Sequence, residues 1–215
     1  MARMTAKMIA DINNLREAFR VAAFGSRVDA LEYGSVATPA TGTVTPVGVV
    51  KYVTTPALGT AIATHAAVTL GAAATTVTTG FTQPDFARVV SVKGNASGNA
   101  GNVVVNGTDM ADAVITETLA LNAATEVIGT LAFKSITSVV LPIQTHVGTD
   151  TVSIGRGNII GFPVAIPTTT RVLSKMFNNA VDSGTVTAAT TVSGSTFAPA
   201  GTLDGSKEVS VIFVA

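Results

Sequence analysis

The sequence predicts a mainly β fold: an antiparallel β-sandwich or barrel, jelly-roll or Ig-like, preceded by an N-terminal amphipathic helix and an extended arm. Beyond Pro84, short runs rich in Val, Ile and Thr recur. Segments rich in Gly, Asn and Asp, which tolerate positive φ, separate these runs. No helical periodicity comes between them, and evenly spaced strands without helices indicate a sandwich or a barrel.

Residues 1–33 predict one amphipathic helix. Met4, Met8, Ile12, Leu15 and Phe19 recur at the spacing that places side chains on one stripe of an α-helix. A single helix cannot bury its own stripe, so these five residues are the candidate partner-binding site. Their alternatives are packing on the helix's own domain, on another copy of the chain or in a groove of another protein. A membrane surface is disfavoured because the polar face carries charges of both signs.

Residues 34–74 predict an extended arm. Pro39, Pro46 and Pro56 interrupt runs of Val and Thr, and proline cannot donate a ladder hydrogen bond, so these runs are expected to be edge strands or extended segments. The segment 57–74 is uncharged but contains His65, several Thr and two Gly. Its modest hydropathy favours a buried arm over a membrane span.

Residues 75–215 predict the β-domain. The expected strands are Arg88–Lys93, Asn102–Asn106, Val114–Leu121, Phe133–Leu141, Thr151–Ile154, Arg171–Phe177, Thr185–Val192 and Val209–Val214. The strand Asn102–Asn106 is expected to turn at 107–112 and return through Val114–Leu121 as a hairpin. In the returning strand, Ile115, Glu117, Leu119 and Leu121 form the expected core face, with Glu117 its exception.

The composition excludes several classes of function. The chain has 13 basic and 13 acidic residues, a formal net charge of zero and only 12% charged residues. Without a basic field, nucleic acid is not an expected partner. There is no cysteine, which excludes disulfides and thiolate chemistry, and the first residues lack the apolar block of a secretory signal. A neutral surface of this kind predicts an oligomer whose copies cover it.

No group of residues predicts catalysis, a cofactor or a metal site. His65 and His146, the only imidazoles, stand outside any catalytic motif. Asp109, Asp112 and Glu117 form the densest group of carboxylates. An acid–base pair and a loosely bound cation are alternatives, but a turn collects Asp for local backbone bonds, which the sequence favours.

Two further motifs are read as structural. "SIGRGNIIG", 153–161, is out of register with a dinucleotide-binding loop and opens no helix before Pro163, so it predicts a Gly-rich turn. "SGST", 193–196, does not match the motif of a serine hydrolase. The chain also has no Trp and only two Tyr, which disfavours carbohydrate recognition.

Several strings in residues 75–163 resemble a recurrent type of tailed-bacteriophage virion structural protein, the head decoration, cement or fibre-like family. They are TTVTTGFTQPD, GNASG, NGTD, ITET, AFKSIT and DTVSIGRG, and the closing LDGSKEVSVIFVA is similar in style. The resemblance implies a protein without enzymatic activity or cofactor, located in the virion after assembly in the host bacterial cytoplasm.

The resemblance also implies the partners. They are the major capsid protein or another virion protein, and further copies of the chain, as a trimer, with neither nucleic acid nor membrane involved. Head decoration that stabilises the shell is the expected role. The alternative is a module of a tail or fibre that binds a host surface polymer.

Overall fold

A computed structural model describes residues 48–145 and 149–214. The chain divides into two compact units, Met1–Val50 and Lys51–Ala215, and the description below concerns the second unit and the few residues that lead into it. The predicted N-terminal helix, with Met4, Met8, Ile12, Leu15 and Phe19, lies outside the described residues, as do residues 34–47 of the predicted arm. Among the described residues there is no α-helix, only a 3-10 turn at Thr169–Arg171.

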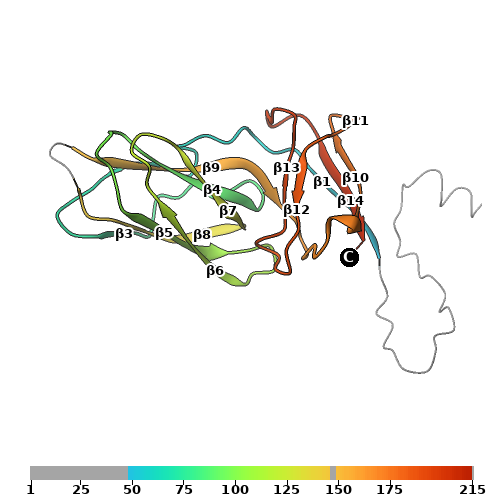
Figure 1. The fold of residues 1–215 in the computed structure, drawn as a ribbon, viewed down its shortest axis with the longest axis horizontal. Helices are drawn as coiled ribbons and strands as arrows, with labels where there is room; N and C mark the ends of the chain where they lie inside the picture. Colours follow the sequence, from blue (N-terminus) through green and yellow to red (C-terminus); the bar gives the residue numbers. More distant parts are fainter. Residues whose placement is uncertain (1–47, 146–148, 215) are drawn as a thin grey trace, which may run out of the picture. The chain divides into compact units, whose positions relative to one another are not determined.

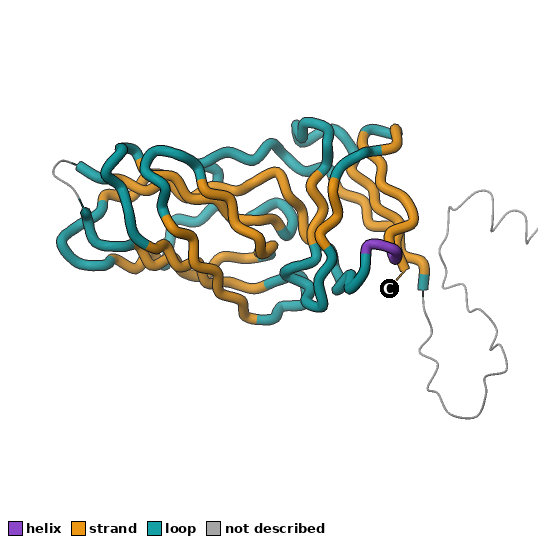
Figure 2. Tube along the Cα trace, viewed as in Figure 1, coloured by secondary structure: helices purple, strands orange, loops and turns teal. Residues whose placement is uncertain are grey.

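The predicted mainly β, antiparallel fold is confirmed, with three sheets (Figures 1 and 2). Sheet A has the order β1 (Val49–Thr54), β14 (Val209–Val214), β10 (Val172–Phe177) and β11 (Ala180–Val181). Sheet B has the order β12 (Thr185–Thr187), β13 (Thr196–Ala198), β9 (Thr151–Gly161), β4 (Arg88–Gly94) and β7 (Val127–Phe133), with β2 (His65–Thr69) also paired to β9. Sheet C has the order β3 (Thr75–Val77), β8 (Ser135–Leu141), β5 (Asn102–Thr108) and β6 (Val114–Ala120).

Sheets B and C enclose the main core. Val90 and Val92 of β4 and Ile154 of β9 pack in one buried cluster with Val105 of β5 and Val139 of β8. Each of these side chains is fully buried, because alternate residues of a strand point to the same side and the two inner faces interdigitate. One buried cluster shared by sheets B and C therefore holds the centre of the unit.

A second group of buried aromatic residues lies beneath sheet A. Phe213 of β14 meets Phe162, which follows β9, edge to face with ring centroids 5.4 Å apart. Phe197 of β13 is also fully buried, and the ammonium group of Lys175 lies 6.0 Å from its ring centroid. Edge-to-face contacts of this kind add to the apolar burial that joins sheet A to the end of sheet B.

The expected hairpin is confirmed. β5 and β6 pair over seven consecutive residues without a register shift, joined by the turn at 109–113. Along β6, Ile115, Glu117 and Leu119 are more buried than the residues between them, which are exposed. The predicted core face is therefore correct, including the place of Glu117 on it.

Three predictions of local structure need correction. The strand expected at 133–141 is β8 from Ser135 onward, but Phe133 ends β7, because the chain passes at Lys134 from sheet B to sheet C. The segment 153–161 is not a turn, because β9 continues through its glycines to Gly161. The strand expected at 185–192 ends at Thr187, and the following loop turns back to β13.

The described part of the proline-interrupted region, residues 48–74, has one strand next to a proline, β1 before Pro56, and β1 lies at one edge of sheet A as expected. Residues 57–74, considered as a membrane span and rejected from the sequence, form a loop and β2. None of the described residues form a helix long and apolar enough to cross a membrane.

Candidate functional site

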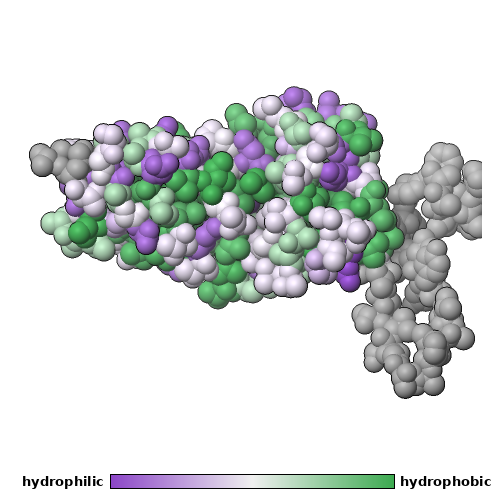
Figure 3. Space-filling model, viewed as in Figure 1, coloured by the Kyte–Doolittle hydropathy of each residue, from purple (hydrophilic) through white to green (hydrophobic). Residues whose placement is uncertain are grey.

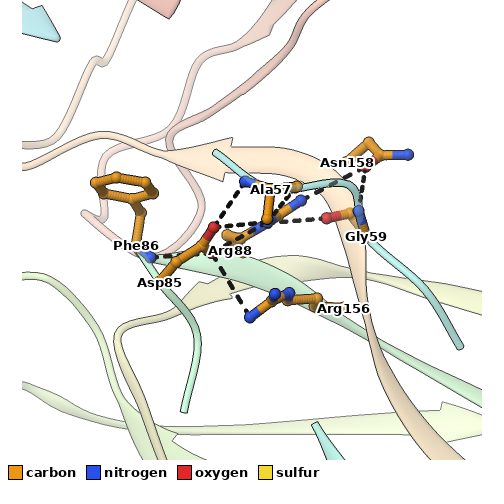
Figure 4. A network of polar contacts seen from close by, with 8 residues as sticks. Ala57, Gly59, Asp85, Phe86, Arg88, Arg156 and Asn158 are labelled. Atoms are coloured by element: carbon orange, nitrogen blue, oxygen red, sulfur yellow. Dashed lines mark hydrogen bonds and ion pairs between the residues drawn. The ribbon is translucent and has the colours of Figure 1, made fainter. Parts of the chain in front are cut away.

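The most strongly interacting polar group in the described chain is Arg88, at the start of β4 (Figure 4). Its side chain is fully buried. Nε donates to the Gly157 carbonyl oxygen at 3.1 Å, and Nη1 donates to the Ala57 carbonyl oxygen at 2.7 Å and to the Asp85 carboxylate at 3.0 Å. Nη2 lies 3.5 Å from Asn158 Oδ1. A buried guanidinium is stable only when paired and hydrogen-bonded in this way.

Asp85 completes the network from the loop before β4. Its Oδ2 accepts from the Ala57 amide at 2.9 Å, and its Oδ1 lies 3.8 Å from Arg156 Nη1 on β9. Burial raises the pKa of Asp85, but the Ala57 amide and the guanidinium groups of Arg88 and Arg156 outweigh it and lower the pKa below its ordinary value. The carboxylate is therefore held in its charged form.

The same surroundings act on Arg88 and Tyr52. Burial lowers the pKa of Arg88, and the Asp85 carboxylate opposes that shift. Burial also raises the pKa of the Tyr52 hydroxyl on β1, and the charge of Asp85 adds to the increase. Tyr52 Oη and Arg156 Nε are both buried without a hydrogen-bond partner among the described residues. The network connects the segment after β1 with strands β4 and β9, so its role is to stabilise the fold.

One glycine of β9 allows the segment after β1 to lie directly on that strand, and a second makes room for side chains of neighbouring strands. A Cβ on Gly155 would lie 2.2 Å from the Thr60 carbonyl oxygen, and a Cβ on Gly157 would lie 2.6 Å from a methyl of Val89. The amide of Gly59 donates to Asn158 Oδ1 at 2.7 Å. Gly155 is thus needed for the close approach of two backbones and Gly157 for the packing of the Val89 and Ile128 side chains, and the motif is neither a turn nor a phosphate-binding loop.

The three clustered carboxylates have separate local partners. Asp109 Oδ1 accepts from the amides of Ala111 and Ala113, within the turn between β5 and β6. Asp112, with φ of 60°, pairs with Lys134 at 2.6 Å. The described residues contain no group of three or more His, Cys, Asp or Glu side chains placed to hold a metal ion. Asp109 thus bonds the backbone of the turn itself, as the sequence favours, while Asp112 pairs with Lys134, which precedes β8.

Glu117 reaches across from sheet C to sheet B. Its Oε1 accepts from the amide of Thr130 at 2.6 Å, from the Thr130 hydroxyl at 2.9 Å and from the amide of Leu131 at 3.3 Å. These amides lie on the free edge of β7. A Cβ on Gly129 would lie 2.4 Å from Glu117 Oε2, so the glycine leaves room for the carboxylate. Glu117 therefore links β6 of sheet C to β7 of sheet B.

The remaining residues considered for chemistry have packing roles where they are described. His65 meets the Phe81 ring edge to face at 5.5 Å, and its Nδ1 lies 2.7 Å from the Ala66 carbonyl oxygen. Ser195 of "SGST" is fully buried, accepts from the Ile166 amide at 2.8 Å and donates to backbone carbonyl groups of its own loop. His146 lies outside the described residues.

Sequence reasoning missed the Arg88 network. Its only local signal is the spacing of Asp85 and Arg88 in "DFAR", three residues apart at the start of a strand. The other partners, Ala57 and Asn158, are distant in sequence and bond through backbone or amide groups that no motif marks. Searches against family models, curated proteins and solved structures find no match to the chain.

Proposed function

We propose that this chain is a non-enzymatic structural protein of a tailed-bacteriophage virion, a decoration or cement protein that stabilises the head. The observation that carries the proposal is what the buried and half-buried charged side chains bind. Arg88, Asp85, Asp109 and Glu117 all bind backbone groups of this chain. When the charged side chains of a protein bind its own backbone, they stabilise the fold and do not face a substrate. Such an arrangement suits a structural role better than a catalytic one.

The surface supports the same proposal. Figure 3 shows a face on which weakly polar and apolar residues predominate and strongly hydrophilic ones are scattered. Exposed large apolar side chains include Val53, Ile62, Val114, Leu173 and Val181. With charged residues at only 12% of the sequence, such a surface gains stability when neighbouring proteins cover it.

The mechanism is additive burial repeated over many copies. The N-terminal stripe, Met4, Met8, Ile12, Leu15 and Phe19, binds the major capsid protein or another virion protein, and further copies of the chain contribute oligomer contacts. Apolar burial contributes about 25 cal/mol per Å², less the cost of ordering the segment. Contacts that are weak singly become strong when copies on one shell bind together.

Deletion of residues 1–33 tests the proposal. These residues lie outside the unit Lys51–Ala215, so the far-ultraviolet circular dichroism of the β fold should survive while occupancy on purified particles falls sharply. Leu15→Asp should reduce occupancy in the same way. Asn13→Asp, which adds the same charge opposite the stripe, is the matched control and should bind normally. Full occupancy by the truncated chain would contradict the proposal.

An image reconstruction of the particle distinguishes the two candidate locations, the head and the tail. Decoration of the head predicts density for this chain at repeated positions of the shell lattice. Density confined to the tail would favour the alternative, a module that binds a host surface polymer, and absence of the chain from purified particles would refute both.

A further inference from the structure

β6 is an edge strand whose outward backbone groups have no partner in the described chain. It pairs only with β5. The backbone bonds from Asp109 to Ala113 and from Leu121 to Gly101 fix the alternation, so the odd-numbered residues of β6 bond to β5. The amide and carbonyl groups of Thr116 and Thr118 therefore point away from the sheet. Figures 1 and 2 show β6 on the lower margin of the drawn strands.

The other edges of the described sheets are protected against strand addition. On β7, Glu117 covers the amides of Thr130 and Leu131, and the Ser193 carbonyl oxygen accepts from Ala132. β1 carries the exposed Lys51. β2 has a register shift, β3 and β12 have three residues each, and β11 has two. Short, bulged, charged or covered edges resist pairing. β6 has seven regular residues, and its one charged side chain, Glu117, is turned inward and bonded to β7, so the outer row of β6 is uncharged.

The outer side chains of β6 suit a β-sheet partner. Val114, Thr116, Thr118 and Ala120 are exposed and uncharged. A row of side-chain hydrogen bonds crosses the outer face of sheet C, from Ser138 Oγ to Asn106 at 3.1 Å and from Asn106 to Thr116 Oγ1 at 2.8 Å. The row ends at β6, where Thr116 is fixed beside the open edge.

We propose that β6 pairs with β6 of a second copy, antiparallel about a two-fold axis at Thr116, so that sheet C continues across both copies. An antiparallel pair of identical strands is self-complementary by symmetry. A register centred on Glu117 would set two carboxylates directly opposite each other, which is destabilising. The register centred on Thr116 places each Glu117 opposite Ile115 of the second copy and each Thr118 opposite Val114.

This inference does not depend on the proposed function. It concerns the free protein, so a chain that stays monomeric would refute it and leave attachment to particles untested. Conversely, loss of attachment on deleting residues 1–33 has no bearing on β6.

A single introduced cysteine tests the register, because the natural chain has none. Thr116→Cys in the full-length protein brings two thiols together, since hydrogen-bonded antiparallel partners have Cα atoms about 5.5 Å apart, within the range of a disulfide. Mild oxidation, which removes two electrons and two protons to join the sulfur atoms, should give a covalent dimer. Thr118→Cys is the control, because its two copies would lie about 13 Å apart along the strands.

Sedimentation velocity tests the pairing without cross-linking. Thr116→Lys sets two ammonium groups face to face and should raise the dissociation constant of the dimer by about tenfold or more. Thr187→Lys, at an exposed position of β12, should leave it unchanged. The proposal is overturned if the natural chain is monomeric at all concentrations, if Thr116→Lys dimerises normally, or if Thr118→Cys cross-links as readily as Thr116→Cys.

Discussion

Replacing Arg88 with methionine should destabilise the fold by about 3–5 kcal/mol, the usual cost of breaking a buried ion pair from one side. The methionine keeps most of the apolar stem but removes every donor. The carbonyl groups of Gly157 and Ala57 lose their bonds of 3.1 and 2.7 Å, and the Asp85 carboxylate loses its nearest cation. Because Arg88 is fully buried, water does not replace the lost donors.

Urea unfolding of the full-length chain, followed by circular dichroism, measures this loss. Arg171→Met is the matched control, because the Arg171 side chain has no hydrogen bond or ion pair with the described residues, and its cost should stay within about 0.5 kcal/mol. The double change Arg88→Met with Asp85→Asn should cost less than the sum of the two single changes, because it leaves no unpaired charge. A loss below about 1 kcal/mol for Arg88→Met would refute the reasoning.

Three further predictions follow from the same geometry. The pKa of Asp85 is lowered in the folded protein, so the stabilisation from its carboxylate is present above pH 3.8, the ordinary pKa, and is lost as the pH falls through the folded-state pKa. Measuring the free energy of unfolding as a function of acid pH should show this loss. Asp85→Asn should remove the part of the loss that comes from Asp85. Gly155→Ala should cost about 1–3 kcal/mol or more through its clash with the Thr60 carbonyl group, while Gly71→Ala, with 3.9 Å of clearance, should be tolerated in the same urea assay. Glu117→Ala should cost about 2–4 kcal/mol and expose the Thr130 and Leu131 amides to hydrogen exchange, whereas Glu117→Gln, which keeps one acceptor oxygen, should cost less.

The elements that the sequence predicts best are those whose signal is local. The hairpin of β5 and β6 combines strict alternation with a turn rich in Gly and Asp, and the structure preserves both its register and its core face. β7 is missed because Gly129 breaks its run of strand-forming residues, although that glycine makes room for Glu117 of the neighbouring sheet. The passage between sheets at Lys134 has no sequence signal of its own.

The glycines of β9 show why the site is harder to predict than the sheets. In sequence, Gly155 and Gly157 resemble a turn, because glycine is common where φ is positive. In the structure neither has a positive φ, and each is glycine because another segment lies against it. Such a glycine is explained by the residues that lie against it. For Gly155 these are Thr60 and Ala61, about a hundred residues away, and for Gly157 they are Val89 and Ile128. The same holds for Arg88, whose carbonyl partners are supplied by backbone and carry no residue preference.

The distribution of polar groups links the interior to the proposed pairing at β6. Glu117 of β6 accepts hydrogen bonds from the edge amides of β7 and so protects the edge of β7. The edge of β6 itself has no strand beside it among the described residues. Native sheets usually protect a long edge with a lysine, a proline or a bulge, and β6 has none of these along its seven residues. An edge kept open beside an edge that is actively covered is what a strand-addition interface requires, and Thr116 lies at its centre.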